Sequence, residues 1–94
     1  MKQDHAEAVQ WYGKAADQGV AVAQFNLGLA YDDGQGVPQN LLAAYAWFTI
    51  AAANGYTKAE KGMANTKKKL TQAQLGQAEA LAQDMIKKNP KLIK

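Results

Sequence analysis

The fold is decided by the stretch 23-AQFNLGLAYDDGQGVPQNLLAAYAWFTIAAANGYTKA-59, because its second half has a copy upstream. Shifting the chain by 36 residues aligns 8-AVQWY-12 with 44-AYAWF-48 and Gly19 with Gly55. Self-similarity at one fixed period of this size is typical of repeat arrays, in which each unit buries its apolar face on its neighbours.

The apolar periodicity predicts an all-α solenoid without strands. Apolar residues recur at helical spacing, as Ala8, Trp11 and Ala15 do near the N-terminus. The expected helices cover residues 4–17, 21–33, 41–53, 57–69 and 72–88. The chain then reads as one domain (1–94), with a half repeat (4–20), a full repeat (21–56), a half repeat (57–70), a capping helix (71–88) and a tail (89–94). We expect the tail to be frayed.

Several residues mark where the helices end. Asp4 and Asn40 are expected N-caps, and 71-TQAQ-74 matches a capping box. Gly19 and Gly55 stand where a left-handed residue ends a helix. The run 33-DGQGVP-38 breaks a helix, because it contains two glycines and a proline. Gly28 lies inside a helix, where glycine costs about 1 kcal/mol relative to alanine. We therefore expect a neighbouring helix to approach closely at Gly28, with an indole ring against it.

Composition excludes several classes of function. The chain has no Cys, Ser or Arg and a single His. These absences exclude thiolate nucleophiles, serine hydrolases, sulfur-ligated metals and arginine clamps for phosphate. We therefore expect no catalytic residue, no metal and no cofactor, and we classify the chain as a non-enzyme.

The remaining sequence features that could carry chemistry have simpler interpretations. His5 lacks a partner on its own helical face, so we expect a solvated residue. The run 32-DDGQG-36 lacks the alternating acids and the final Glu of a calcium loop. Trp11 and Trp47 hold equivalent repeat positions, so we expect both in the core. The run Lys67–Lys69 could contact nucleic acid, but no Arg or recognition helix accompanies it.

These features resemble the Sel-one-like repeat family, α/α solenoids related to tetratricopeptide repeats. The resemblance rests on Ala23, Leu27, Gly28, Tyr31, Gly34, Gly36, Val37, Pro38, Ala44, Trp47, Ala51, Ala52 and Gly55. The chain departs from the family at Asn40, where Asp is usual. It also departs in the last copy, where Lys67 and Leu70 stand at the positions equivalent to Tyr31 and Gly34. The resemblance implies a non-catalytic adaptor or scaffold that binds other proteins or peptides.

In such solenoids the first helix of each repeat lines a concave groove that binds peptides. The resemblance therefore implies a groove formed by Val22, Phe25, Leu29, Asp32, Asp33, Lys58, Lys61, Asn65, Lys68 and Lys69. Lys61 and Asn65 are similar to a clamp that some relatives use for a terminal carboxylate. We expect an acidic or C-terminal peptide to lie across this surface.

Charge and the incomplete first repeat suggest self-association. Residues 1–57 carry a net charge of −3 and residues 58–94 carry +6, so the molecule should be a charge dipole. We expect a homodimer through the exposed side of the first helix, with Val9, Trp11 and Tyr12 as contacts. The alternative to an adaptor is a structural piece of a longer repeat array whose main interaction is self-association. A small enzyme and a nucleic-acid-binding protein are the weaker alternatives. Neither a membrane span nor a signal peptide is evident, so we expect a cytoplasmic protein unless a precursor segment was removed.

Overall fold

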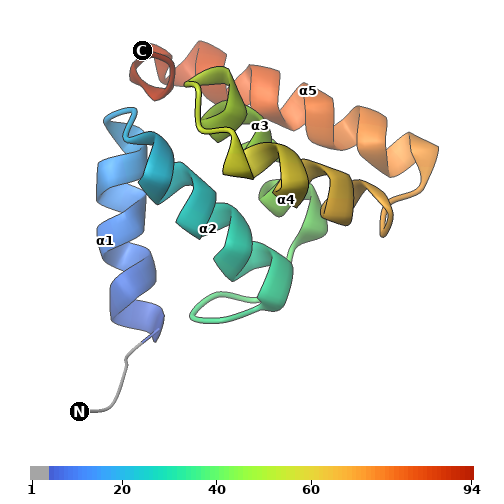
Figure 1. Ribbon diagram of the computed structural model, residues 1–94, viewed down its shortest axis with the longest axis horizontal. Helices are drawn as coiled ribbons and strands as arrows, with labels where there is room; N and C mark the ends of the chain where they lie inside the picture. The colour runs from blue at the N-terminus through green and yellow to red at the C-terminus, as the bar shows by residue number, and fades with distance from the viewer. Residues whose placement is uncertain (1–4) are drawn as a thin grey trace.

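The computed structural model describes residues 5–94 and contains α-helices joined by short turns (Figure 1). The helices are α1 (His5–Asp17), α2 (Ala21–Asp33), α3 (Leu41–Ala53), α4 (Lys58–Lys67) and α5 (Gln72–Lys88), followed by the 3-10 helix η1 (Pro90–Leu92). Over the described residues there is no strand, so the all-α prediction is confirmed. The helix bounds agree with the predicted ones to within two residues.

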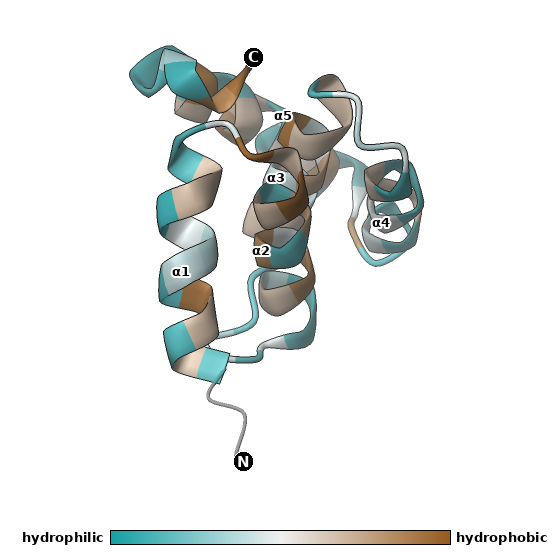
Figure 2. Cartoon of the chain, turned by 60° about the vertical axis from the view of Figure 1, so that its left-hand side comes forward, coloured by the Kyte–Doolittle hydropathy of each residue, from teal (hydrophilic) through white to brown (hydrophobic). Residues whose placement is uncertain are grey.

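The middle of the array is α3, which packs against α2, α4 and α5. Nearly every residue from Ala44 to Ala51 is buried, because neighbours cover this helix on several sides. In Figure 2 the centre of the molecule is correspondingly brown and α4 is mostly teal. None of the described helices is both long and apolar enough to cross a membrane.

The predicted helix ends are present wherever they can be described. The Asn40 side chain accepts a hydrogen bond from the Ala43 amide at 3.1 Å, and Thr71 and Gln74 form the capping box. Gly19 and Gly55 both adopt left-handed φ values, of 86° and 88°. The predicted N-cap at position 4 lies outside the described residues.

Close helix packing at Gly28 is confirmed, but the ring that contacts it is not an indole. A Cβ atom built on Gly28 would lie 2.5 Å from the Phe48 ring, and one on Gly62 would lie 2.8 Å from it. The Phe48 side chain is 1% exposed and wedges between α2 and α4. The two glycines therefore allow the helices to close on a phenyl ring.

The expectation that both tryptophans are in the core is right for one and wrong for the other. Trp47 is 9% exposed, whereas Trp11 is 62% exposed. The side of α1 that faces α2 presents Val9, Tyr12 and Ala16 instead. Trp11 points away from that contact, with the Lys14 ammonium 5.1 Å from its ring centroid.

The C-terminal tail is docked, so the expectation of fraying is wrong. The Leu92 side chain is 2% exposed, and the Leu92 carbonyl accepts hydrogen bonds from the Gln24 and Asn54 side chains at 2.9 and 2.7 Å. Gln24 is fully buried and also donates to the Ala16 carbonyl at 3.1 Å. In Figure 1 the red C-terminus accordingly lies beside the turn between α1 and α2.

Candidate functional site: a pocket between the first two helices and the adjoining α2–α4 face

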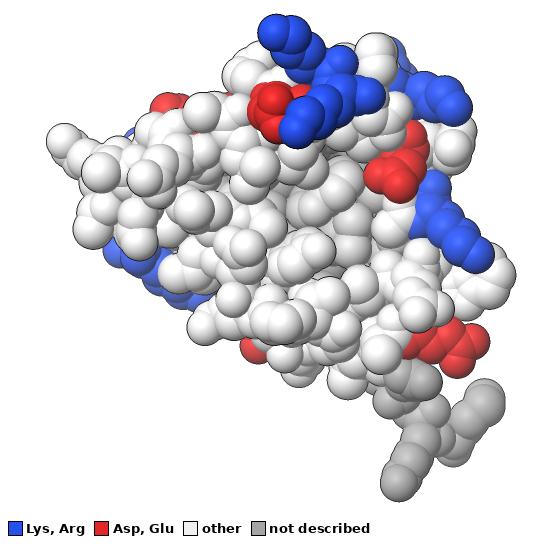
Figure 3. Space-filling model, turned by 180° about the vertical axis from the view of Figure 1, so that it is seen from behind, with Lys and Arg blue, Asp and Glu red and all other residues white. Residues whose placement is uncertain are grey.

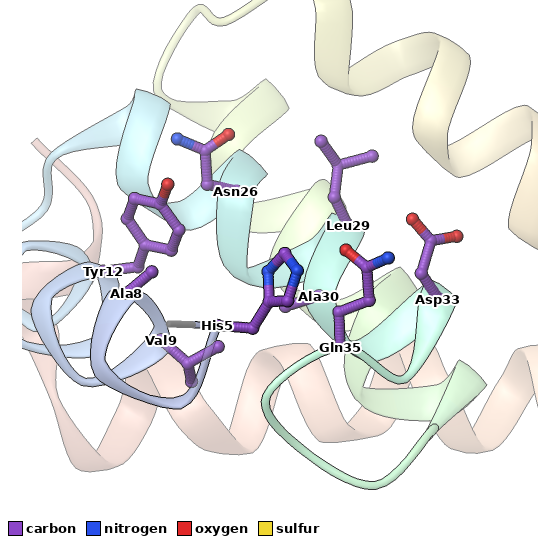
Figure 4. Close-up of a pocket in the computed structure, with 9 residues that line it drawn as sticks. All are labelled: His5, Ala8, Val9, Tyr12, Asn26, Leu29, Ala30, Asp33 and Gln35. Atoms are coloured by element: carbon purple, nitrogen blue, oxygen red, sulfur yellow. The ribbon is translucent and has the colours of Figure 1, made fainter. Parts of the chain in front are cut away.

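A pocket of about 190 Å³ opens between α1 and α2 (Figure 4). From α1 it is lined by His5, Ala8, Val9 and Tyr12, from α2 by Asn26, Leu29, Ala30 and Asp33, and from the following loop by Gln35. Figure 4 shows Tyr12 and Val9 on the α1 side, with Leu29 and Asp33 opposite them on α2. The loop is held close to α1, because a Cβ on Gly36 would overlap the His5 carbonyl.

The pocket lies at a helix–helix contact whose equivalent in the next repeat is filled by a side chain. We call the contact between α1 and α2 the first joint and the equivalent contact between α3 and α4 the second joint. In the second joint Phe48 packs against Gly62. In the first joint the equivalent residues are Tyr12 and Asn26. A Cβ at position 62 would lie 2.8 Å from the Phe48 ring, so Asn26 cannot accept Tyr12 in the pose of Phe48.

Two further residues of the second joint are more deeply buried than the residues at the equivalent positions of the first joint. Tyr45 is 6% exposed, whereas its equivalent Val9 is only half-buried. Burial, and secondarily the negative charge of Glu79, raises the pKa of the Tyr45 hydroxyl above its ordinary value. Thr66, equivalent to Ala30, is fully buried and donates to the Asp32 carboxylate at 3.3 Å.

Five polar side chains line the pocket without a partner inside the described part of the protein. His5, Tyr12, Asn26, Asp33 and Gln35 make no side-chain hydrogen bond or ion pair to another described residue. Their polar atoms are therefore available to a ligand. Across residues 5–94 no cluster of three or more His, Cys, Asp or Glu side chains could hold a metal ion.

The pocket continues at Leu29 into the exposed face of α2 and α4, which lie together at the front of Figure 1. Val22 and Leu29 are 47% and 38% exposed on this face. On α4 and at its C-cap, the expected polar groove residues Lys58, Lys61, Asn65 and Lys68 are all exposed. The opposite face, seen in Figure 3, carries its charged side chains mainly at its edges.

Three of the predicted groove residues instead make contacts within the fold. Phe25 is half-buried, with its ring centroid 5.6 Å from that of Phe48. The Asp32 carboxylate has a side-chain exposure of 13% and pairs with the Lys69 ammonium at 3.2 Å. Asp32 therefore joins α2 to α4, and this part of the face is an internal contact of the solenoid.

The residues predicted for self-association do not form one surface. Val9 and Tyr12 are half-buried and line the pocket, whereas Trp11 lies on the outer side of α1. A shallow hollow beside the Trp11 ring is lined by Ala6, Glu7, Gln10, Trp11 and Lys14. Of the three, Trp11 alone is exposed on the outer side of α1.

Sequence reasoning missed the pocket, although it named Leu29 and Asp33. His5 was expected to be a solvated residue, and it is exposed at the pocket edge. Asn26 and Gln35 were not predicted as site residues, because asparagine and glutamine are common on helix surfaces and in loops. The available signal was the change from Gly62 to Asn26 between equivalent positions, which is visible only when the copies are aligned.

Comparison with known proteins decides the family. The model of the Sel1 repeat matches residues 1–20 and 21–56. The chain belongs to the Sel1 repeat family. Sel1 repeats generally mediate protein–protein interactions, and the family is typically non-catalytic.

Several curated relatives share the repeat region. The chain is 41% identical over 54 residues to the chitin synthase regulator SKT5 of Saccharomyces cerevisiae, covering 57% of this chain and 8% of that protein. It is 45% identical over 58 residues to an F-box protein of Arabidopsis thaliana, covering 62% of this chain and 16% of that protein. The chain thus spans less than a fifth of the length of either relative.

A solved structure matches nearly the whole chain. It is the crystal structure of a protective antigen present in uropathogenic Escherichia coli strains, which displays an SLR fold. The match has a TM-score of 0.88 and 39% identity, and it covers 98% of this chain and 20% of the antigen. The Sel1 solenoid architecture, including the helix after the last repeat, is therefore shared with that protein.

Proposed function

We propose that this Sel1 repeat chain is an adaptor module that binds a peptide segment of another protein across the α2–α4 face. The observation that carries the proposal is that α2 exposes the apolar side chains of Val22 and Leu29 and packs on α4, where Lys61 and the C-cap residue Lys68 are exposed. An apolar strip beside ammonium groups suits an extended segment with apolar anchors and either acidic residues or a terminal carboxylate.

Electrostatics favour acidic residues at the α4 end of the peptide. Residues 58–94 carry a net charge of +6, and Lys58 and Lys61 on α4 and Lys68 at its C-cap are exposed. Neither Lys61 nor Lys68 has a charged partner among the described residues. Their charges are therefore available to a partner, and the interaction should weaken as salt screens it.

The test is selection of binding peptides from a random linear library, followed by affinity measurement with synthetic copies. Lys61→Glu combined with Lys68→Glu should weaken binding of acidic peptides at least about tenfold, because repulsion replaces attraction at two contacts. Lys87→Glu combined with Lys91→Glu is the matched control, since it makes the same charge change on exposed side chains outside α4. If both double variants bind like the parent, the α2–α4 face is not the binding surface.

A second candidate function, homodimer formation, is favoured by one specific observation. Trp11 exposes 62% of its surface on α1, which among the described elements packs mainly on α2 and also contacts the docked tail. A large exposed indole is a typical interface anchor. Sedimentation velocity should show a dimer that Trp11→Gln dissociates. A monomer at tens of micromolar would remove this candidate.

A further inference from the structure

We infer that the pocket between α1 and α2 is a subsite for one cationic side chain, Lys or Arg, of the bound peptide. This inference rests on the proposed function, because it specifies one residue of the peptide that the α2–α4 face would hold. It concerns a different set of side chains, however, since only Leu29 is shared between the pocket and the exposed apolar strip.

The polar lining of the pocket is suited to a cation. The Asp33 carboxylate only accepts hydrogen bonds, and the Asn26, Gln35 and Tyr12 side chains each add an oxygen that can accept one. No Lys is among the nine lining residues, and the chain contains no Arg. An anion would therefore meet the Asp33 charge with no Lys or Arg among the described lining residues to compensate it, whereas an ammonium or guanidinium group would form a charge-assisted hydrogen bond.

The Asp33 carboxylate, unlike that of Asp32, is not used in a contact within the described structure. Asp32, the neighbouring acid, is already paired with Lys69 and hydrogen-bonded to Thr66. The Asp33 side chain makes no ion pair or hydrogen bond to another described residue, and it is exposed at the pocket rim. The two adjacent acids therefore have different surroundings, because Asp32 joins α2 to α4 while Asp33 lies at the rim of the pocket.

Size and apolar lining fit a single long side chain. About 190 Å³ is far too small for a peptide segment but is of the order of one large side chain. Ala8, Val9, Leu29 and Ala30 contribute apolar surface, which would pack against the methylene stem of Lys or Arg. The head group could then reach the oxygens of the lining while the peptide backbone continues past Leu29.

The charge distribution assigns the peptide a direction. The pocket belongs to the acidic half of the chain, with a net charge of −3 over residues 1–57, and α4 belongs to the basic half. A peptide with its basic residue in the first joint would place acidic residues, or its C-terminal carboxylate, over α4. The preferred ligand is therefore bipolar along its length.

The test uses the whole chain and the random linear peptide library described above. Selected peptides should be enriched in one Lys or Arg at a fixed spacing from the acidic residues. Replacing that residue with norleucine keeps the stem but removes the charge, and it should weaken binding to the parent protein about tenfold. Asp33→Asn should weaken the unsubstituted peptide by a similar factor and should leave the norleucine peptide unaffected.

Asp17→Asn is the matched control, because it makes the same change on an exposed aspartate at the opposite end of α1. It should bind the peptide like the parent. If peptides bind the α2–α4 face but the norleucine peptide binds equally well, the pocket inference is overturned while the proposed function stands. Equal affinity for Asp33→Asn and the parent has the same meaning. If no peptide in the library binds, the proposed function and the inference both fail.

Discussion

The first and second joints occupy equivalent places in the repeat, yet one contains a pocket and the other is filled. In the second joint Phe48 is 1% exposed and rests against Gly62, which has no side chain to obstruct it. In the first joint Tyr12 and Asn26 stand at the same positions and a cavity of about 190 Å³ remains. The exchange between Gly62 and Asn26 is one reason for this difference, because close packing against a ring leaves little room for an added side chain.

A second difference lies in what surrounds each joint. The second joint is central, since α3 also packs on α2 and α5. The first joint involves α1, the outermost of the described helices, which packs mainly on α2 and also contacts the C-terminal tail. Position in the array thus decides how much a residue is buried, even when the repeat makes its type the same.

The largest effect is expected from removing the two equivalent rings. Phe48→Ala should lower the free energy of unfolding by about 3–5 kcal/mol, because it deletes a fully buried ring. Tyr12→Ala should cost less than half as much, since Tyr12 is half-buried beside an existing cavity. Urea denaturation followed by circular dichroism measures both values. Equal losses would mean that the two joints are equally well packed.

Weakening the tail should loosen the first joint selectively. Leu92→Ala should lower the free energy of unfolding by about 2–4 kcal/mol, because Leu92 is 2% exposed and its surroundings include the end of α1. Hydrogen exchange should show a larger loss of protection in α1 than in α4. The control is Ile93→Ala, at a half-buried neighbouring position, which should change exchange less. Uniform loss over all helices would contradict a role specific to α1.

Placing the first-joint residue in the second joint should disturb the packing moderately. Gly62→Asn should destabilise the protein by about 1–3 kcal/mol, because the new side chain overlaps the Phe48 ring. Gly76→Asn is the control, since a Cβ on Gly76 in α5 meets no atom within 4 Å. That control should lie within about 0.5 kcal/mol of the parent. Thermal unfolding of the two variants gives the comparison, and equal midpoints would show that Gly62 is not constrained.

The smallest effect is expected at the exposed tryptophan. Trp11→Ala should change the free energy of unfolding of the monomer by no more than about 0.5 kcal/mol, because most of the ring is already in water. The equivalent change in α3, Trp47→Ala, should cost about 3–5 kcal/mol. The pair can be measured by urea denaturation at a low protein concentration. A large loss for Trp11→Ala would indicate a packing contact on the outer side of α1.

Much of the fold could be predicted from the sequence, because helices are specified locally. The 36-residue period predicted the helices that the structure contains. The helix ends were predicted too, at the left-handed Gly19 and Gly55 and at the N-caps Asn40 and Thr71. Predictions that depended on a distant partner were less accurate. The indole expected at Gly28 is the Phe48 ring, and the tail expected to fray is held by Gln24 and Asn54.

The candidate site was only partly predictable. The α4 lysines were named from their helical face and are exposed. Asp32 was also predicted to line the groove, but its carboxylate pairs with Lys69 and accepts a hydrogen bond from Thr66 of the next repeat. The pocket could not be predicted from one helix, because its lining comes from α1, α2 and a loop that the fold brings together.

By itself the sequence determined the helices, their repeat period and the residue type at each repeat position, since these depend on local periodicity and turn chemistry. Only the tertiary structure decided which equivalent residues are buried, where the C-terminal tail docks and which joint keeps a cavity. The physical reason is that burial depends on the neighbours that surround a helix. Trp11 and Trp47 have the same place in the repeat, but only α3 is enclosed by other helices.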